Sequence, residues 1–412
     1  IPVNLQLNCQ EFELSASFSL QLEYLQMKKS LIALAVMGAS TVAFAASNVT
    51  LYGVIEEGVV VQKAKHQDTT VSLKSGFDQG SRWGIRGVEE LGNGYSVGFI
   101  LEQGFNADNG DQAVAGKQFS RESILYVTGG FGRFGFGRTG TLASGAQSNN
   151  ILTGWALGTG FGLSAWTSFG GGFSRTDNAV FYKTPSFGGL TISAMYSNGY
   201  TGDDAKWSKN NHYYGIGAKY EANAIKSSLI FEAMDNKGTE VASKTAGSLF
   251  NIGQWAVVEG YDPAKLTDAQ KDEYKAWAKT SLDDATAAKK RALMINYGLE
   301  YNMGAWTPMF AYQWFNQDGG KKTHMFGLSA KVGVAGGDIL VGGRYLFGHD
   351  EALTGDDKVR AWNLGAAYIY PLSKRTALKA YAGYADSSKG WKDKEEVAYN
   401  GYQLYLGMRH SF

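Results

Sequence analysis

The sequence predicts an all-β fold, a 16-stranded antiparallel transmembrane β-barrel with an inward-folded third loop. Segments of about ten residues with alternating polarity recur along the chain, each bounded by Gly, Asn or Asp, as in barrel strands. The connections alternate between short and long, which is typical of turns at one end of a barrel and external loops at the other. The composition agrees, because 54 glycines, 23 tyrosines and only 5 prolines favour strands joined by tight turns.

Sixteen segments fit the pattern, and an even number is typical of bacterial outer-membrane barrels. A barrel of this size encloses a water-filled lumen. The predicted strands lie near 49–62, 79–90, 94–105, 118–128, 132–139, 177–185, 189–198, 211–221, 225–235, 291–302, 305–316, 322–332, 338–348, 359–370, 375–386 and 399–412. The long connections are 63–78, 106–117, 139–176 and 236–290.

The last predicted strand has two distinct faces. Phe412, Met408 and Leu406 share one face, and Ser411 and Arg409 share the other. The first set suits lipid and the second suits an aqueous interior. A strand of a soluble sandwich would also alternate, but a terminal position that ends in Phe favours the membrane barrel.

The N-terminal residues are predicted to lie outside the barrel. A short basic start, an apolar run and an Ala-Phe-Ala site mark residues 27–45 as a secretory signal peptide. Residues 1–26 precede its Met and are expected to be an upstream extension. The barrel domain is then 46–412. The single cysteine, Cys9, lies in the extension, which fits an exported protein that does not rely on disulfides.

The stretch 139–174 contains nine glycines and no charged residue. Irregular runs of this length inside compact domains are uncommon and usually functional. We expect it to fold into the barrel and narrow its pore, with neutral groups such as Ser148 and Thr153 facing charged side chains of the wall.

Arginines on the predicted strands are the candidate wall residues. Arg82 and Arg86 share one face of the second strand, and three more lie on or at the end of strands within the first six. A guanidinium that faces lipid costs about 2–4 kcal/mol at the bilayer midplane, so these side chains should face the lumen. The alternative is that they only solvate the wall and pair with carboxylates. The predicted constriction residues are Arg82, Arg86, Arg121, Arg138, Arg175, Glu56, Glu102, Asn149, Asn150 and Trp155.

Other functional motifs are weak. Gly130, Gly132 and Gly135 have the spacing of a dinucleotide fingerprint, but a strand pattern follows instead of a helix, so these glycines indicate a hairpin turn. The five histidines lack metal-ligand spacing, and no G-x-S-x-G is present. A formal net charge of +1 argues against a nucleic-acid partner. We therefore predict no catalytic residue, no metal and no cofactor.

The insertion 236–290 is predicted to be an external loop with a short helix. Thr267 and Gln270 have capping-box spacing, and Tyr274 and Trp277 begin one face of the helical pattern. An exposed variable loop without a role in transport is an equal alternative.

Several motifs together resemble a known family. They are V-T-L-Y-G at 49–53, S-R-W-G-I-R-G-V-E-E-L-G at 81–92, E-Q-G-F at 102–105, F-G-R-F-G-F-G-R at 131–138 and R-H-S-F at 409–412. In these motifs the chain resembles the trimeric general porins of Gram-negative outer membranes, particularly their β-proteobacterial and neisserial branch. The resemblance covers 46–412 and is thin across 236–290.

The resemblance implies a third loop folded against a basic cluster of Arg82, Arg121 and Arg175, with Arg138 at the start of the loop. It also implies a homotrimer in the bacterial outer membrane, in contact with lipid and lipopolysaccharide. The terminal Phe412 would be the signal read by the barrel-assembly machinery.

The function implied is a passive diffusion channel for small hydrophilic solutes and ions. Many relatives carry acidic residues on the third loop, and 139–174 has none. This departure favours a mild anion preference over cation selectivity. The alternative is a barrel that acts mainly as an adhesin, a surface antigen or an outer-membrane enzyme.

Overall fold

The structure, a computed structural model, describes residues 48–64, 68–158, 170–199, 207, 210–236, 261–262, 265–273, 290–353, 355–392 and 400–412. Val49–Phe412 form one compact unit. The predicted signal peptide and upstream extension lie outside the described residues.

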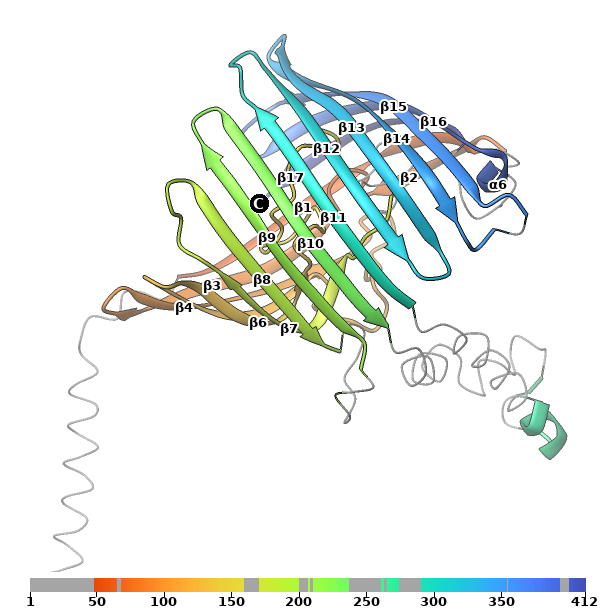
Figure 1. The fold of residues 1–412 in the computed structure, drawn as a ribbon, viewed down its shortest axis with the longest axis horizontal. Helices are drawn as coiled ribbons and strands as arrows, with labels where there is room; N and C mark the ends of the chain where they lie inside the picture. The colour runs from red at the N-terminus through yellow and green to blue at the C-terminus, as the bar shows by residue number, and fades with distance from the viewer. Residues whose placement is uncertain are drawn as a thin grey trace, which may run out of the picture. The chain divides into compact units, whose positions relative to one another are not determined.

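The strands, shown in Figure 1, are β1 (Asn48–Ala64), β2 (Thr70–Ser75), β3 (Arg82–Gly92), β4 (Tyr95–Gly104), β5 (Glu122–Gly129), β6 (Gly132–Gly140), β7 (Arg175–Lys183), β8 (Leu190–Asn198), β9 (His212–Ala222), β10 (Ile225–Asn236), β11 (Lys290–Tyr301), β12 (Trp306–Gln317), β13 (Lys321–Val334), β14 (Gly337–Asp350), β15 (Lys358–Pro371), β16 (Thr376–Ser387) and β17 (Gly401–Ser411).

The strands form one antiparallel sheet that closes on itself. From β3 to β17, each strand pairs with the next one in the sequence, and β17 pairs with β1 from Val54↔Ser411 to Ala64↔Gly401. Both β2 and β3 pair with β1, so together they fill one position in the ring. The described residues therefore build the closed sixteen-stranded barrel that the sequence predicts.

The prediction was wrong for 63–78, which was expected to be a single long connection. Within it, β2 pairs with β1 from Gln62↔Thr70 to Glu57↔Ser75. Residues 76–81 then turn toward the interior, and β3 begins at residue 82 instead of 79. A strand of six residues is too short for the ten-residue pattern that revealed the others.

The two predicted faces of the last strand are confirmed. Leu406 and Met408 are 68% and 49% exposed on the outer face, whereas Tyr405 is buried inside. At the end of the strand, the backbone N–H of Phe412 donates to the carbonyl of Gly53 at 3.1 Å, and the N–H of Gly53 donates back at the same distance. These two bonds close the barrel at the end where the short turns lie.

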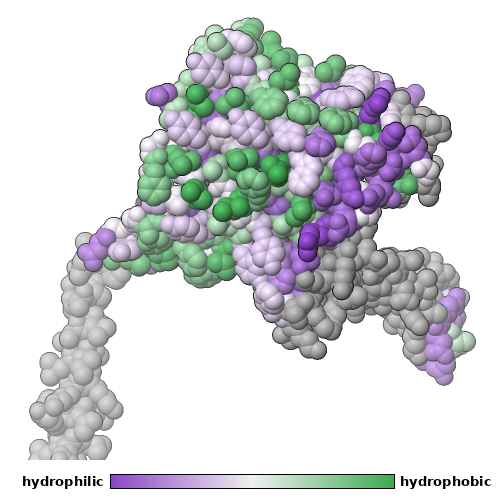
Figure 2. All heavy atoms as spheres, in the orientation of Figure 1, coloured by the Kyte–Doolittle hydropathy of each residue, from purple (hydrophilic) through white to green (hydrophobic). Residues whose placement is uncertain are grey.

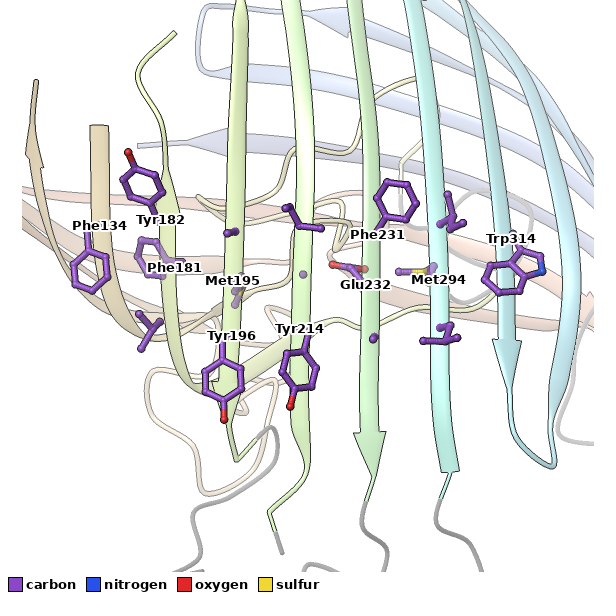
Figure 3. A pocket seen from close by; sticks show the side chains of 17 residues that line it. Phe134, Phe181, Tyr182, Met195, Tyr196, Tyr214, Phe231, Glu232, Met294 and Trp314 are labelled. Carbon is purple, nitrogen blue, oxygen red and sulfur yellow. The ribbon is translucent and has the colours of Figure 1, made fainter. Parts of the chain in front are cut away.

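The outer face of the barrel is largely apolar, and Figure 2 shows hydrophobic side chains over the visible side. Across β6–β12 this face is hollowed by a groove of about 670 Å³, which Figure 3 shows from close by. Its exposed lining includes Phe134, Tyr214 and Phe231. Such a surface matches the hydrocarbon of a membrane.

Residues 141–174 are called the inner loop here. The apolar core lies inside the barrel, between the wall and the described parts of this loop. From the inner loop, Leu142, Ile151 and Phe173 pack in a buried cluster with wall residues such as Tyr213 and Met294. The predicted inward folding of this stretch is confirmed for its described parts, 141–158 and 170–174.

In the part of the chain that the structure describes, short helical segments also lie outside the strands. A helical turn spans residues 268–273, and the Thr267–Gln270 capping box is formed, with the N–H of Thr267 donating to Oε1 of Gln270 at 2.8 Å. The continuation of that predicted helix, including Tyr274 and Trp277, lies outside the described residues. The unpredicted helix α6 (Lys389–Lys392) buries Trp391, whose Nε1 donates to Oδ2 of Asp350 at 2.8 Å. Within the described parts, no helix has the length and apolar character needed to cross a membrane.

Candidate pore constriction

A cavity of about 640 Å³ lies between the inner loop and the wall that runs from β1 to β7. Residues 144–148 of the loop form one side of it. The charged residues that line this cavity are four arginines and three carboxylates, and we call the cavity the arginine cavity. These side chains are Arg82, Arg86, Arg121, Arg175, Asp78, Glu102 and Glu122.

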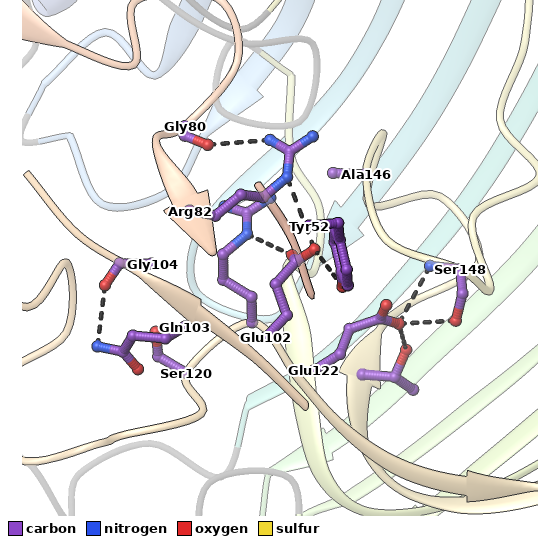
Figure 4. Close-up of polar contacts among 12 residues, drawn as sticks. Tyr52, Gly80, Arg82, Glu102, Gln103, Gly104, Ser120, Glu122, Ala146 and Ser148 are labelled. Carbon is purple, nitrogen blue, oxygen red and sulfur yellow. Dashed lines mark hydrogen bonds and ion pairs between the residues drawn. The ribbon is translucent and has the colours of Figure 1, made fainter. Parts of the chain in front are cut away.

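Glu102, on β4, organises two of these arginines. It accepts a hydrogen bond from Nε of Arg121 at 2.6 Å, and its second oxygen lies 3.6 Å from Nε of Arg82. The same second oxygen accepts from the hydroxyl of Tyr52 at 2.9 Å (Figure 4). Because a guanidinium carries five N–H donors, one carboxylate holds both arginines in place without using all their donors.

On the loop side, Gln147 meets the arginines. With its amide oriented by hydrogen bonding, its oxygen accepts from Nη2 of Arg175 at 2.8 Å and from Nη2 of Arg121 at 3.1 Å. Gln147 has a positive φ of 69°, which is uncommon for a residue other than glycine. The sequence does not point to Gln147, because a single glutamine in an uncharged loop carries no pattern.

Glu122, on β5, ties the inner loop to the arginine side of the wall. Its Oε1 accepts from the hydroxyl of Thr139 at 2.8 Å, and from the backbone N–H and hydroxyl of Ser148 at 3.1 and 2.7 Å (Figure 4). Much of its hydrogen-bonding capacity therefore serves the loop.

On the far side, the inner loop is held by acceptors on β10–β13. In the described parts of the loop, backbone N–H groups donate to side chains of these four strands at five points. The pairs are Ala143 to Glu232 at 3.0 Å, Thr153 to Ser228 at 3.2 Å, Gly154 to Glu300 at 3.1 Å, Ala156 to Ser329 at 3.0 Å and Gly171 to Gln313 at 2.9 Å. The described parts of the loop have no regular secondary structure, so their backbone groups need such partners, and this wall supplies them.

A second cavity of about 530 Å³ lies between loop residues 152–158 and the wall of β11–β17. It meets the arginine cavity at four shared residues, Asp78, Gln79, Ser144 and Gly145. Trp155 lines it, and the guanidinium of Arg344 lies 5.1 Å from the Trp155 ring.

The structure brings together most, but not all, of the predicted constriction residues. Five of them line the arginine cavity and one lines the second cavity. The five are Arg82, Arg86, Arg121, Arg175 and Glu102, and the sixth is Trp155.

The other four predicted residues have structural contacts instead. Arg138 donates to the carbonyl of Ser120 at 2.8 Å and pairs with Asp177. Glu56 is fully buried and pairs with Lys379 rather than with an arginine.

Asn149 and Asn150 shape the loop. Nδ2 of Asn149 donates to the hydroxyl of Thr139, and Oδ1 of Asn150 accepts from the N–H groups of Gly145 and Leu152. Among the described residues that line the two cavities, none of these four occurs.

The loop offers only neutral groups to Arg82, Arg121 and Arg175, as expected, but residues outside the loop add negative charge to the cavity. Three carboxylates share their cavity, and Thr153 lies in the second cavity, where its hydroxyl donates to Glu300. Ser148 contacts Glu122. The loop itself is uncharged, but the residues around it are not.

Comparison with known proteins identifies the barrel. A family model described as Gram-negative porin matches residues 30–390. The chain belongs to the Gram-negative porin family. This porin is 27% identical over 413 residues to an outer membrane porin protein of Bordetella pertussis, with 94% of the chain and 100% of the relative covered. It is 29% identical over 409 residues to outer membrane porin protein 32 of Delftia acidovorans, with the same coverage.

Solved structures have the same fold. The anion-selective porin from Comamonas acidovorans matches with a TM-score of 0.61 at 22% identity, over 89% of this chain and 100% of that one. The trimer form of OmpT from Vibrio cholerae matches with a TM-score of 0.56 at 18% identity and the same coverage. The porin is thus an outer-membrane channel, and the resemblance noted in its sequence is confirmed.

Proposed function

We propose that this porin conducts small hydrophilic solutes and ions passively with a mild preference for anions, and that the arginine cavity is its constriction. The observation that carries the proposal is the charge of that cavity. Four arginines outnumber three carboxylates, and the loop that faces them adds no charge. Fixed positive charge in a narrow aqueous passage concentrates anions and repels cations.

Two of the three carboxylates oppose the arginines only in part. Glu122 is engaged by loop donors, and Asp78 pairs with Lys379. Salt screens this field, with a Debye length of about 10 Å at 0.1 M and about 3 Å at 1 M. The anion preference should therefore be stronger in dilute salt.

The relatives support this assignment and the oligomeric state. The structural neighbour named as anion-selective shares the barrel, and another neighbour forms a trimer. We propose a homotrimer in contact with outer-membrane lipid and lipopolysaccharide, assembled by the barrel-assembly machinery that recognises Phe412. The relatives are porins rather than enzymes, which supports transport rather than catalysis.

A reversal-potential measurement in a KCl gradient tests the proposal. Replacing Arg82, Arg121 and Arg175 together with glutamine should lower the chloride-to-potassium permeability ratio several-fold, because Glu102, Glu122 and Asp78 then dominate the cavity. Replacing three exposed cations elsewhere is the matched control and should leave the ratio unchanged. The control residues are Lys265, Arg291 and Arg375. A wild-type channel that clearly prefers cations in dilute KCl would contradict the proposal.

A further inference from the structure

Residues 76–81, between β2 and β3, form an inward segment that contributes to the lumen. Phe77 is 3% exposed, and its ring lies between Tyr381 and Tyr405, with centroids 5.0 and 4.2 Å away. Leu157 of the inner loop belongs to the same buried cluster. This aromatic contact anchors the inward segment to β16 and β17.

The anchored segment places Asp78 at the junction of the two cavities. Asp78 lines both of them. On the loop side it touches Gly158, where a methyl group would overlap Oδ1 of Asp78. A solute that passes from one cavity to the other therefore passes this carboxylate.

Lys379, on β16, lies behind Asp78. Its Nζ donates to Oε2 of Glu56 at 2.7 Å and to Oδ2 of Asp78. The side chains of Lys379 and Glu56 are both 0% exposed, and that of Asp78 is 11% exposed. The backbone N–H of Asp78 donates to the other oxygen of Glu56 at 2.7 Å, which fixes the inward segment to β1.

The charge excess of the constriction is small enough that the loss of one lysine would cancel it. The lining of the arginine cavity has an excess of one positive charge. Behind it, Glu56 and Lys379 cancel. Without Lys379, the seven charged lining residues and Glu56 together would have no net charge. Asp78 would also lose the cation that pairs with it on the side facing away from the cavity.

We propose that Lys379 is a selectivity-determining residue of the channel, although it does not line the pore. It offsets the charge of Asp78 and holds the inward segment in place. The arginines therefore dominate the electrostatic field where the arginine cavity meets the second cavity. Lys379 is a positioning residue that acts through Asp78. The proposal deepens the assignment of the arginine cavity as the constriction and rests on it.

The test compares reversal potentials of Lys379→Met, Lys379→Arg, Asp78→Asn and the double variant Lys379→Met/Asp78→Asn. In 0.1 M KCl, Lys379→Met should lower the chloride-to-potassium permeability ratio about twofold, the effect of one unit charge at about 8 Å in water with salt screening. Asp78→Asn should raise the ratio by a similar factor, and the double variant should return it to the wild-type value. Lys379→Arg should stay close to wild type.

A merely structural role for Lys379 makes a different prediction. With such a role, Lys379→Met and Asp78→Asn would change stability, but they would not shift the chloride-to-potassium permeability ratio in opposite directions. Lys226→Met, which removes a lysine paired with Glu221 at the periplasmic end, is the matched control and should leave the ratio unchanged. Heat-resistant mobility on a gel confirms that each variant is folded.

The outcomes separate this proposal from the assignment it rests on. Unchanged ratios in folded Lys379→Met and Asp78→Asn channels would overturn the role of Lys379. A wild-type channel without anion preference would overturn the proposed function, whereas opposite shifts of the two variants would still support the role of Lys379. If Lys379→Met does not assemble, Asp78→Asn decides alone, and an unchanged ratio overturns the proposal.

Discussion

The inner loop contacts two walls of the barrel in different ways. Toward β10–β13, its backbone N–H groups donate to side chains such as Glu232 and Glu300. Toward β5–β7, the side-chain oxygen of Gln147 accepts from the guanidinium groups of Arg121 and Arg175. The wall of β10–β13 therefore offers acceptors to the loop, whereas the opposite wall offers guanidinium donors beside one acceptor, Glu122.

This difference explains how a loop without charge takes a defined place among charged residues. A neutral backbone carries both donors and acceptors, so the wall decides which of them face each way. The acceptors of β10–β13 fix the position of the loop. Among the described loop residues, the amide oxygen of Gln147 occupies the guanidinium donors in part, and Glu102 uses one donor of Arg121, so other donors of these arginines remain available to the lumen.

Removing the acceptors should have the largest effect. In Glu232→Leu/Glu300→Leu, the N–H groups of Ala143 and Gly154 lose their partners, at a cost of about 1–3 kcal/mol for each buried donor left unpaired. We expect a barrel with normal heat-resistant mobility but a higher and more fluctuating single-channel conductance. Glu221→Leu, at the periplasmic end, is the control. A steady conductance of wild-type size would show that apolar packing alone holds the loop.

A smaller effect on stability should follow from a substitution that pushes the inner loop away from the wall of β10–β13. Gly298 of β11 lies directly under the loop, and a methyl group there would overlap the carbonyl oxygen of Thr153. Gly298→Ala should cost about 1–3 kcal/mol through overpacking and lower the temperature at which heat-resistant mobility is lost. Gly130→Ala is matched, because its added methyl group would meet nothing within 4 Å. Equal melting of the two variants would mean that the loop adjusts without strain.

The smallest expected effect distinguishes Glu102 from Glu122, the two glutamates that line the arginine cavity. Glu102→Gln and Glu122→Gln each remove one negative charge from the arginine cavity, so each should raise the chloride-to-potassium permeability ratio about twofold. Only Glu122→Gln should also increase current fluctuations, since Glu122 holds Thr139 and Ser148. Current noise in 0.1 M KCl separates the two, and equal noise would place the anchoring of the loop elsewhere.

Much of the barrel follows from the sequence because its strands repeat a local pattern. Alternation reveals which residues of a strand share a face, and the cost of an arginine in lipid places Arg82 and Arg86 inside. Those inferences need only neighbours within one strand. The short strand β2 and the helix α6 are missed because neither is long enough to show a period.

The charge pairing of the constriction depends on which strands are neighbours around the ring. Lys379 and Glu56 are 323 positions apart in the sequence and come together because β16 and β1 flank β17. Asp78 reaches them only because the chain turns inward after β2. Nothing in the spacing of these residues indicates that they meet, and the same holds for Gln147 and its two arginines.

The seam between β1 and β17 also sets the order in which the barrel can fold. From β3 to β17, each strand pairs with the next strand in the sequence, so these pairs form between neighbouring segments of the chain. The seam joins Val54 to Ser411 and closes a loop of several hundred residues, which costs about 3 kcal/mol more in chain entropy than a ten-residue hairpin. Until it forms, β1 and β17 each expose a row of unpaired backbone groups, which hydrocarbon does not tolerate. Closure is therefore expected to be the slow, late step of folding, and the nascent barrel needs protection at two edges until that step is complete.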